Sequence, residues 1–100
     1  MTDNESAAIL QFFAAQGHTE LKTSLGKLTQ IGELPVKWEF GRITRVGNTA
    51  VLWTYDKALN RNIIKKFGSD SQSPQAVYNE AGDIVKIGDL EIKPEEGDGN

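Results

Sequence analysis

Basic and aromatic residues, the side chains best suited to binding chemistry, concentrate in the middle of this 100-residue sequence. The segment from Val36 to Phe67 holds seven of the eleven Lys and Arg residues and five of the eight aromatic residues. Guanidinium and ammonium groups pair with carboxylates or phosphates, and aromatic rings offer flat apolar surfaces for stacking. We therefore predict a binding surface here, with six cationic candidates for partner contacts: Arg42, Arg45, Lys57, Arg61, Lys65 and Lys66.

Residue patterns that carry catalysis or metal binding are missing from the sequence. His18 is the only histidine and there is no cysteine, so a typical zinc site cannot be assembled. Neither a Gly-rich phosphate loop nor a Gly-x-Ser-x-Gly nucleophile motif occurs. Acid-base catalysis needs rigidly held carboxylates, whereas Glu95-Glu96, Asp83 and Asp89 fall in expected turns or in the tail. We expect no enzyme activity, no catalytic residue, no metal site and no cofactor.

Length and composition describe one small folded domain. One hundred residues suffice for a single modest core, and 38% apolar with 25% charged residues argues against disorder. No apolar run reaches the length of a membrane helix, the N-terminus lacks the pattern of a secretory signal, and the absence of cysteine fits a reducing compartment. From these features we predict a cytoplasmic protein without membrane contact.

Charge is distributed unevenly around a net value of −3. Residues 36–68 hold seven basic and two acidic residues, whereas residues 69–100 hold two basic and eight acidic ones. This asymmetry permits two interpretations. The basic segment can face an anionic partner such as a nucleic acid, or the acidic strands can lie beside the basic ones and neutralise them across a sheet.

Two helical patterns precede the basic segment. In the first, Ile9, Phe12 and Phe13 have the i, i+3, i+4 spacing of one apolar helix face. We expect this helix to begin at a cap on Thr2 or Asp3 and to end at Gly17 in a left-handed conformation. The second has leucines at i, i+4, i+7, namely Leu21, Leu25 and Leu28. The threonines and serine among them are poor helix formers, so an irregular segment or a short strand is the alternative.

Gly47-Asn48 separates two β-patterned runs and predicts a two-residue hairpin turn, in which Val46 pairs with Thr49. Counting outward from this turn places the aromatic side chains on one face. Arg42 falls on that same face opposite Trp53, whose ring offers it a stacking surface. With the first helix and a third strand at residues 62–67, the predicted core contains Phe12, Trp38, Phe40, Val51, Trp53, Tyr55, Ile63 and Phe67.

The C-terminal part predicts a second β-meander. The Gly-, Ser- and Pro-containing stretch 68–74 is typical of a loop. Short β patterns follow it, at residues 76–78, 84–87 and 90–93.

These elements predict an α+β fold. One or two N-terminal helices would pack on a curved antiparallel sheet or on a small SH3/OB-like barrel. The domain would span residues 1–94, divided into a helical part (1–35), the basic aromatic hairpin with its third strand (36–67) and the second meander (76–93), and an acidic flexible tail would follow (95–100).

Two functions fit this description. The favoured hypothesis is a non-enzymatic protein-protein binding module: an adaptor, an accessory subunit or an inhibitor of a larger assembly, with a virus- or plasmid-encoded factor as one version. The alternative is a small barrel that binds single-stranded nucleic acid, in which Trp38, Trp53 or Tyr55 stack on bases and the cations follow phosphates. A core needs most of the eight aromatics, which favours the protein partner. The oligomeric state stays open.

Overall fold

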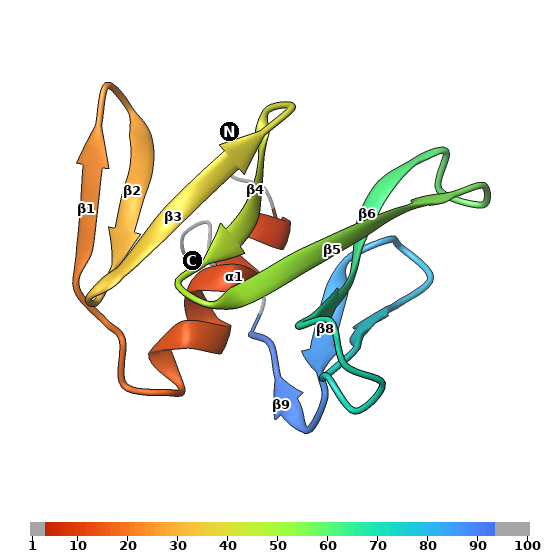
Figure 1. Cartoon of the computed structure of the whole chain (residues 1–100). Coiled ribbons are helices and arrows are strands. Elements are labelled where there is room, and N and C mark those ends of the chain that lie inside the picture. The colour runs from red at the N-terminus through yellow and green to blue at the C-terminus, as the bar shows by residue number, and fades with distance from the viewer. Residues whose placement is uncertain (1–3, 94–100) are drawn as a thin grey trace, which may run out of the picture.

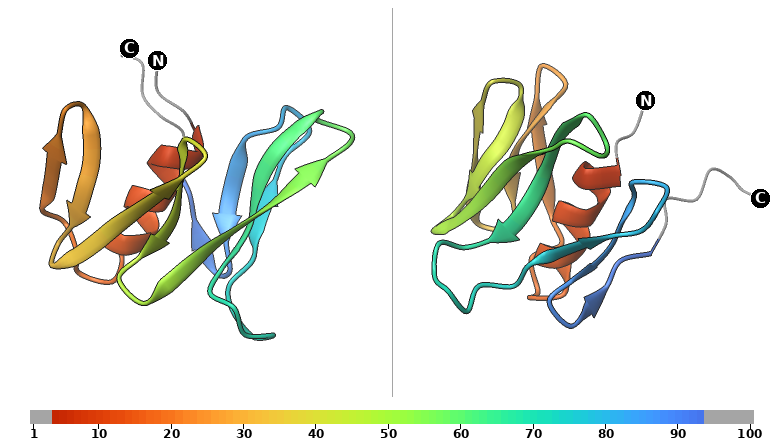
Figure 2. Two further views of the ribbon diagram at one scale, coloured as in Figure 1. Left: turned by 45° about the horizontal axis from the view of Figure 1, so that its top comes forward. Right: turned by 90° about the vertical axis from the view of Figure 1, so that its right-hand side faces the viewer.

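The structure is a computed structural model that describes residues 4–93 (Figure 1). One helix, α1 (Asn4–Ala14), lies between two antiparallel sheets, as the right-hand view of Figure 2 shows. The larger sheet is a meander of six strands in chain order: β1 (Leu21–Ser24), β2 (Lys27–Ile31), β3 (Leu34–Glu39), β4 (Arg42–Val46), β5 (Thr49–Asp56) and β6 (Arg61–Phe67). The smaller sheet holds β7 (Ala76–Tyr78), β8 (Ile84–Ile87) and β9 (Leu90–Glu91).

The α+β prediction is therefore confirmed in its coarse form, with one helix and not two. The sheets do not close into a barrel within residues 4–93. No helix in this range is long and apolar enough to cross a bilayer. The two cap candidates of the first helix and the acidic tail at 95–100 lie outside the described residues.

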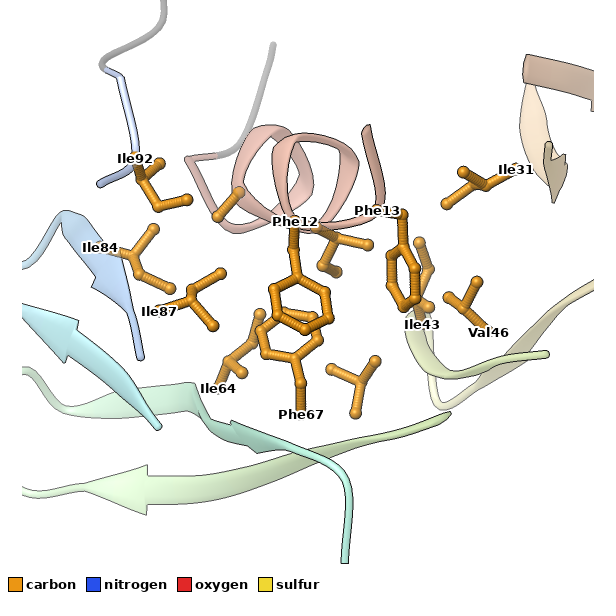
Figure 3. Close-up of a cluster of buried hydrophobic side chains, with 13 residues drawn as sticks. Phe12, Phe13, Ile31, Ile43, Val46, Ile64, Phe67, Ile84, Ile87 and Ile92 are labelled. Atoms are coloured by element: carbon orange, nitrogen blue, oxygen red, sulfur yellow. The ribbon is translucent and has the colours of Figure 1, made fainter. Parts of the chain in front are cut away.

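Helix α1 forms the centre of the core because both sheets pack against it. Phe12 stacks on Phe67 of β6, with ring centroids 4.5 Å apart, and Phe13 is fully buried beside the larger sheet. On its other side the helix meets Ile84 and Ile87 of the smaller sheet and Ile92, which follows β9 (Figure 3). The apolar face expected from the spacing of Ile9, Phe12 and Phe13 is thus covered from two directions.

The helix ends where the sequence indicated. Gly17 has φ +96° and its N–H donates to Ala14 O over 3.0 Å, while His18 N–H donates to Phe13 O over 3.0 Å. This pair of bonds is the Schellman motif, in which a left-handed glycine lets the chain satisfy the last helical carbonyls.

A short sequence unit occurs three times and gives rise to the repeated hairpins. It reads Gly-x-apolar-x-x-apolar-Gly-x-x-x-apolar and begins at Gly26, Gly41 and Gly82. In each copy both glycines have positive φ, between 79° and 89° at the first and between 58° and 61° at the second. The apolar residue before the second glycine is fully buried in every copy: Ile31, Val46 and Ile87. The repeat therefore fixes a hairpin turn, a core contact and the entry into the next strand.

The second predicted helix is wrong, because Leu21–Ile31 forms the β1–β2 hairpin. Its turn is Leu25-Gly26, and Leu25 is fully exposed with φ +55°. Leucines at i, i+4 and i+7 match a helical face, but the strand alternative fits a stretch rich in β-branched and short polar residues. Pairing with β2 decides between the two, since Leu21 lies opposite Ile31 and Thr23 opposite Leu28.

The hairpin at Gly47-Asn48 has the predicted turn, with Val46 opposite Thr49 and Arg45 opposite Ala50. The pairing between β4 and β5 stops after these two residue pairs, and the run before the turn is two strands and not one. The chain reverses at Phe40-Gly41, so β4 pairs with β3 along most of its length. Beyond the turn, β5 pairs with β6 from Val51 to Asp56.

Three of the eight predicted core residues need correction. Phe40 lies in the β3–β4 turn and is 91% exposed, and Tyr55 is 55% exposed near the end of the β5–β6 hairpin. Ile63 is only half-buried, while Ile64 is fully buried. The cause is an irregularity in β6, where Leu52 pairs with Lys66 but Trp53 pairs with Ile64; the extra residue shifts the alternation by one.

The other five predicted core residues lie in or against the core. Phe12, Val51 and Phe67 are buried, whereas Trp38 and Trp53 are half-buried and pack on the cluster from its edge.

Candidate functional site

Neighbouring hairpins of the larger sheet join only at their bases, so a V-shaped opening separates their outer parts. Two residue pairs link β2 to β3, and two link β4 to β5. A tryptophan bridges each opening: Trp38 Nε1 donates to Leu28 O over 2.7 Å, and Trp53 Nε1 donates to Ile43 O over 2.9 Å. The spacing of 15 residues between the two tryptophans reproduces the same contact in the next hairpin.

A cation covers each of these indole rings. The guanidinium carbon of Arg42 lies 5.5 Å from the centroid of the Trp53 ring, and Nζ of Lys27 lies 5.3 Å from that of Trp38. Both distances are within the range of a cation–π interaction. The predicted stacking of Arg42 on Trp53 is thus present, although the two residues belong to diverging strands and not to a cross-strand pair.

The opening between the β3–β4 and β5–β6 hairpins contains a hollow of about 450 Å³. Its floor and walls combine apolar surface with positive charge, and they include Lys37, Phe40, Arg42, Arg45, Leu52 and Trp53. We call this hollow the hairpin cleft. It contains two of the six predicted binding cations, together with aromatic and aliphatic side chains that can contact an apolar group.

Positive charge prevails in the hairpin cleft. Lys37 Nζ lies 3.3 Å from a carboxylate oxygen of Glu39, which also lines the cleft, and Arg45 Nη1 donates to Asn48 O over 3.3 Å. Within residues 4–93, the salt bridges do not include Arg42 or Arg45. Two guanidinium groups at the cleft therefore keep donors available for an anionic group from outside.

Phe40 occupies an unusual backbone position at the rim of the cleft. It has φ +56° and the next residue, Gly41, has φ +79°, so both central residues of the turn have positive φ, as in a type I′ turn. Asn-Gly is the sequence favoured there, and a bulky residue with positive φ is a genuine outlier. Phe40 is nevertheless almost fully exposed, so packing within the domain does not account for the phenyl ring.

A second hollow, of about 500 Å³, adjoins the cleft at the N-terminus of α1 and shares Phe40, Arg42 and Trp53 with it. A partly buried ion pair lies at its edge. Arg61 Nη1 donates to Glu5 Oε2 over 2.7 Å, Arg61 Nη2 donates to Gly82 O over 2.6 Å, and Glu5 is buried. Arg61, predicted as a partner-binding residue, thus ties β6 to the helix and to the turn before β8.

Tyr78 completes this buried group. Its hydroxyl donates to Glu5 Oε2 over 3.2 Å and accepts the N–H of Ile64 over 2.9 Å. Burial, and then the negative charge of Glu5, raise the pKa of Tyr78 well above its usual value of 10. The hydroxyl therefore stays protonated and acts as a fixed donor to the carboxylate.

The remaining predicted cations do not line the hairpin cleft. Lys57 and Lys65 are exposed on the β5–β6 hairpin, and Lys66 Nζ donates to Asp70 O over 2.9 Å. The structure thus brings Arg42 and Arg45 together in the lining of the cleft, while Lys66 lies on the neighbouring strand opposite Leu52.

Two residues of the cleft were missed in the sequence: Lys37 as a binding cation and Phe40 as a surface residue. The signal for Phe40 was the Gly-centred repeat, which aligns Phe40-Gly41 with the turn Leu25-Gly26. Lys37 reaches the cleft through its pairing with Arg45, which the sequence does not signal.

Metal-binding geometry is not present in the part of the chain that the structure describes, where no three His, Asp or Glu side chains form a cluster able to hold an ion. No protein-family model, no curated protein and no solved structure matches this chain.

Proposed function

We propose that this chain is a non-enzymatic protein-binding module, acting as an adaptor, accessory subunit or inhibitor, and that the hairpin cleft is its binding site. The observation that carries the proposal is the combination in one hollow of Phe40, an aromatic side chain that is 91% exposed at a left-handed turn position, with the guanidinium groups of Arg42 and Arg45. Both the exposure and the backbone conformation are unfavourable in the free domain. Covering the ring with a partner would recover the apolar burial that the domain itself does not provide.

The neighbours of Phe40 support the same function. Tryptophan and arginine are the residues most often found at energetic hot spots of protein interfaces, and Trp53 and Arg42 lie beside Phe40 in the cleft. Trp53 is held by its bond to Ile43 O and by Arg42 over its ring, so the surface is ordered before a partner arrives.

Binding of single-stranded nucleic acid remains the second candidate, on the observation that Phe40 and Tyr55 both expose aromatic surface. Two facts weigh against it. Each indole ring is covered by a cation, which leaves less surface for a base, and Lys65 and Lys66 of β6 do not line the cleft with Arg42 and Arg45.

The proposal is tested by selecting peptides from a random phage-displayed library on the immobilised protein. Selected peptides are then measured by fluorescence anisotropy against the parent and the Phe40→Asn variant. We expect peptides that bind the parent and bind Phe40→Asn at least tenfold more weakly. The matched control is Leu25→Asn, which changes the equivalent exposed turn residue of the first hairpin and should leave binding unchanged.

Two results would count against the proposal. Failure to enrich any peptide on the parent protein would remove the protein-binding function. Tight, salt-sensitive binding of a labelled single-stranded oligonucleotide that Phe40→Asn weakens would replace it with the nucleic-acid alternative.

A further inference from the structure

We infer that the partner enters the hairpin cleft as an extended acidic segment, in which carboxylates flank an apolar side chain. This inference rests on the proposed function and specifies the chemistry of the ligand.

The cations of the cleft are placed along its length. Lys37 and Arg45 are a cross-strand pair on β3 and β4, and Arg42 lies further out, over Trp53. Glu39 is the acidic residue among those that line the cleft, and it pairs with Lys37. A ligand with carboxylates on both sides of a central residue would meet Arg45 on one side and Arg42 on the other, since guanidinium groups bind carboxylates through two parallel hydrogen bonds.

The apolar surface lies between these charges. Leu52 and Trp53, both half-buried, and the exposed Phe40 line the cleft together with these cations. A strand rises about 3.3 Å per residue and its alternate side chains point the same way, so an extended segment can place an apolar side chain on the floor with acidic neighbours at the walls. Charge complementarity therefore selects the acidic segment over a neutral or basic one.

The first hairpin opening offers a natural comparison, because the repeat places equivalent residues there. Leu25 stands in the place of Phe40, Lys27 in that of Arg42, and Gln30 in that of Arg45. The first opening therefore has one cation fewer, because Gln30 replaces Arg45 there. It also lacks a guanidinium group for two parallel hydrogen bonds to a carboxylate, because Lys27 replaces Arg42. The acidic ligand should therefore prefer the second opening, and substitutions in the first serve as controls.

The test compares three phage libraries of about twelve-residue peptides, biased toward acidic, neutral and basic residues, on the intact protein. We expect enrichment from the acidic library. A selected peptide, synthesised with a fluorescent label, should bind roughly tenfold more weakly to Arg42→Gln and to Arg45→Gln, and its binding should weaken from 50 to 200 mM salt. Lys27→Gln should leave its affinity unchanged.

The outcomes separate the two proposals. Enrichment of neutral or basic peptides whose binding is lost in Phe40→Asn would overturn the acidic ligand and leave the binding module standing. Equal affinity of the acidic peptide and its Asn/Gln counterpart would also overturn the inference. If no library yields an enriched peptide, both proposals are wrong. The melting temperatures of all variants serve as the control that each variant is folded.

Discussion

Replacement of Phe40 by asparagine should stabilise the fold and abolish binding at the same time. A left-handed residue other than glycine or asparagine costs about 1–2 kcal/mol, and Phe40 has φ +56° in a turn for which Asn-Gly is preferred. Because the side chain is 91% exposed, its removal exposes little buried surface and leaves no cavity. We therefore expect the free energy of unfolding to rise by about 0.5–1 kcal/mol.

For a domain of this size, that gain corresponds to a rise in melting temperature of about 2–8 °C. Circular dichroism during heating and urea denaturation measure the change, and anisotropy with a selected peptide measures the loss of binding. Leu25→Asn provides the matched control, because Leu25 has φ +55° before Gly26 and is fully exposed. It should raise stability by a similar amount and leave binding intact.

Destabilisation of the domain by Phe40→Asn would refute the reasoning, since it would show that the phenyl ring supports the fold. Undiminished peptide affinity in the same variant would refute the assignment of Phe40 to the binding site. A gain in stability together with a loss of affinity would identify Phe40 as a residue retained for contact at the expense of the turn.

Three further predictions concern the repeat and the core. In urea denaturation, Gly32→Ala should lower the free energy of unfolding by about 2–4 kcal/mol and Gly26→Ala by only about 1–2 kcal/mol. The reason is that a Cβ at Gly32 would lie 2.8 Å from His18 Cβ, whereas a Cβ at Gly26 would meet no atom within 4 Å. Equal effects of the two substitutions would contradict this explanation. Trp53→Ala should cost about 2–3 kcal/mol, less than a fully buried tryptophan, and an unchanged urea midpoint would argue against its bridging role. Folding raises the pKa of Tyr78, so as the pH rises above about 10 the hydroxyl loses its proton in the unfolded chain while it keeps it in the folded protein. The free energy of unfolding should therefore fall as the pH rises above about 10. Tyr78→Phe, though less stable at pH 8, should show a smaller fall between pH 8 and 11 than the parent, and a fall as steep as that of the parent would disprove the linkage.

Local signals in the sequence were sufficient wherever one turn or one helix end determined the structure. Gly17 and Gly47 were correctly placed, because each enforces a backbone conformation that few other residues adopt. The face of α1 was readable from Ile9, Phe12 and Phe13, because a helix buries residues at a fixed spacing.

Errors arose where long-range pairing changed the alternation of a strand. Phe40 was placed in the core because Val36 to Val46 matched one continuous strand, and a phenylalanine in a type I′ turn carries no turn signal of its own. Ile63 and Ile64 exchanged roles through an irregularity in β6 that depends on its pairing with β5. Strand counting from one hairpin could not reveal either feature.

The candidate site was predicted only in part, for a related reason. Arg42 and Arg45 were found because they lie in the basic segment, and the contact of Arg42 with Trp53 was expected. Net charge and composition do not distinguish a cation that faces a cleft from one that is paired with a carboxylate inside the domain. Arg61 is the example, because its structural role depends on an ion pair with Glu5, which lies 56 residues away in the sequence. Comparison of the three Gly-centred units with one another would have placed Phe40 in a turn.

The contacts of α1 with the last hairpin have a consequence for the order of folding during synthesis. Asn4 accepts the N–H of Ile84, and the side-chain amide of Gln11 pairs with the backbone of Lys93, so these bonds join residues 80 and 82 positions apart. The strands of the larger sheet pair with neighbours in the chain and can form as they leave the ribosome. One side of the helix, in contrast, is covered only after Ile84, Ile87 and Ile92 have been synthesised. At about 5–20 residues per second, that side stays uncovered for roughly 4–16 s. During this interval the nascent chain displays an apolar helix face to chaperones, and Ile84, Ile87 and Ile92 cover that face once they have been synthesised.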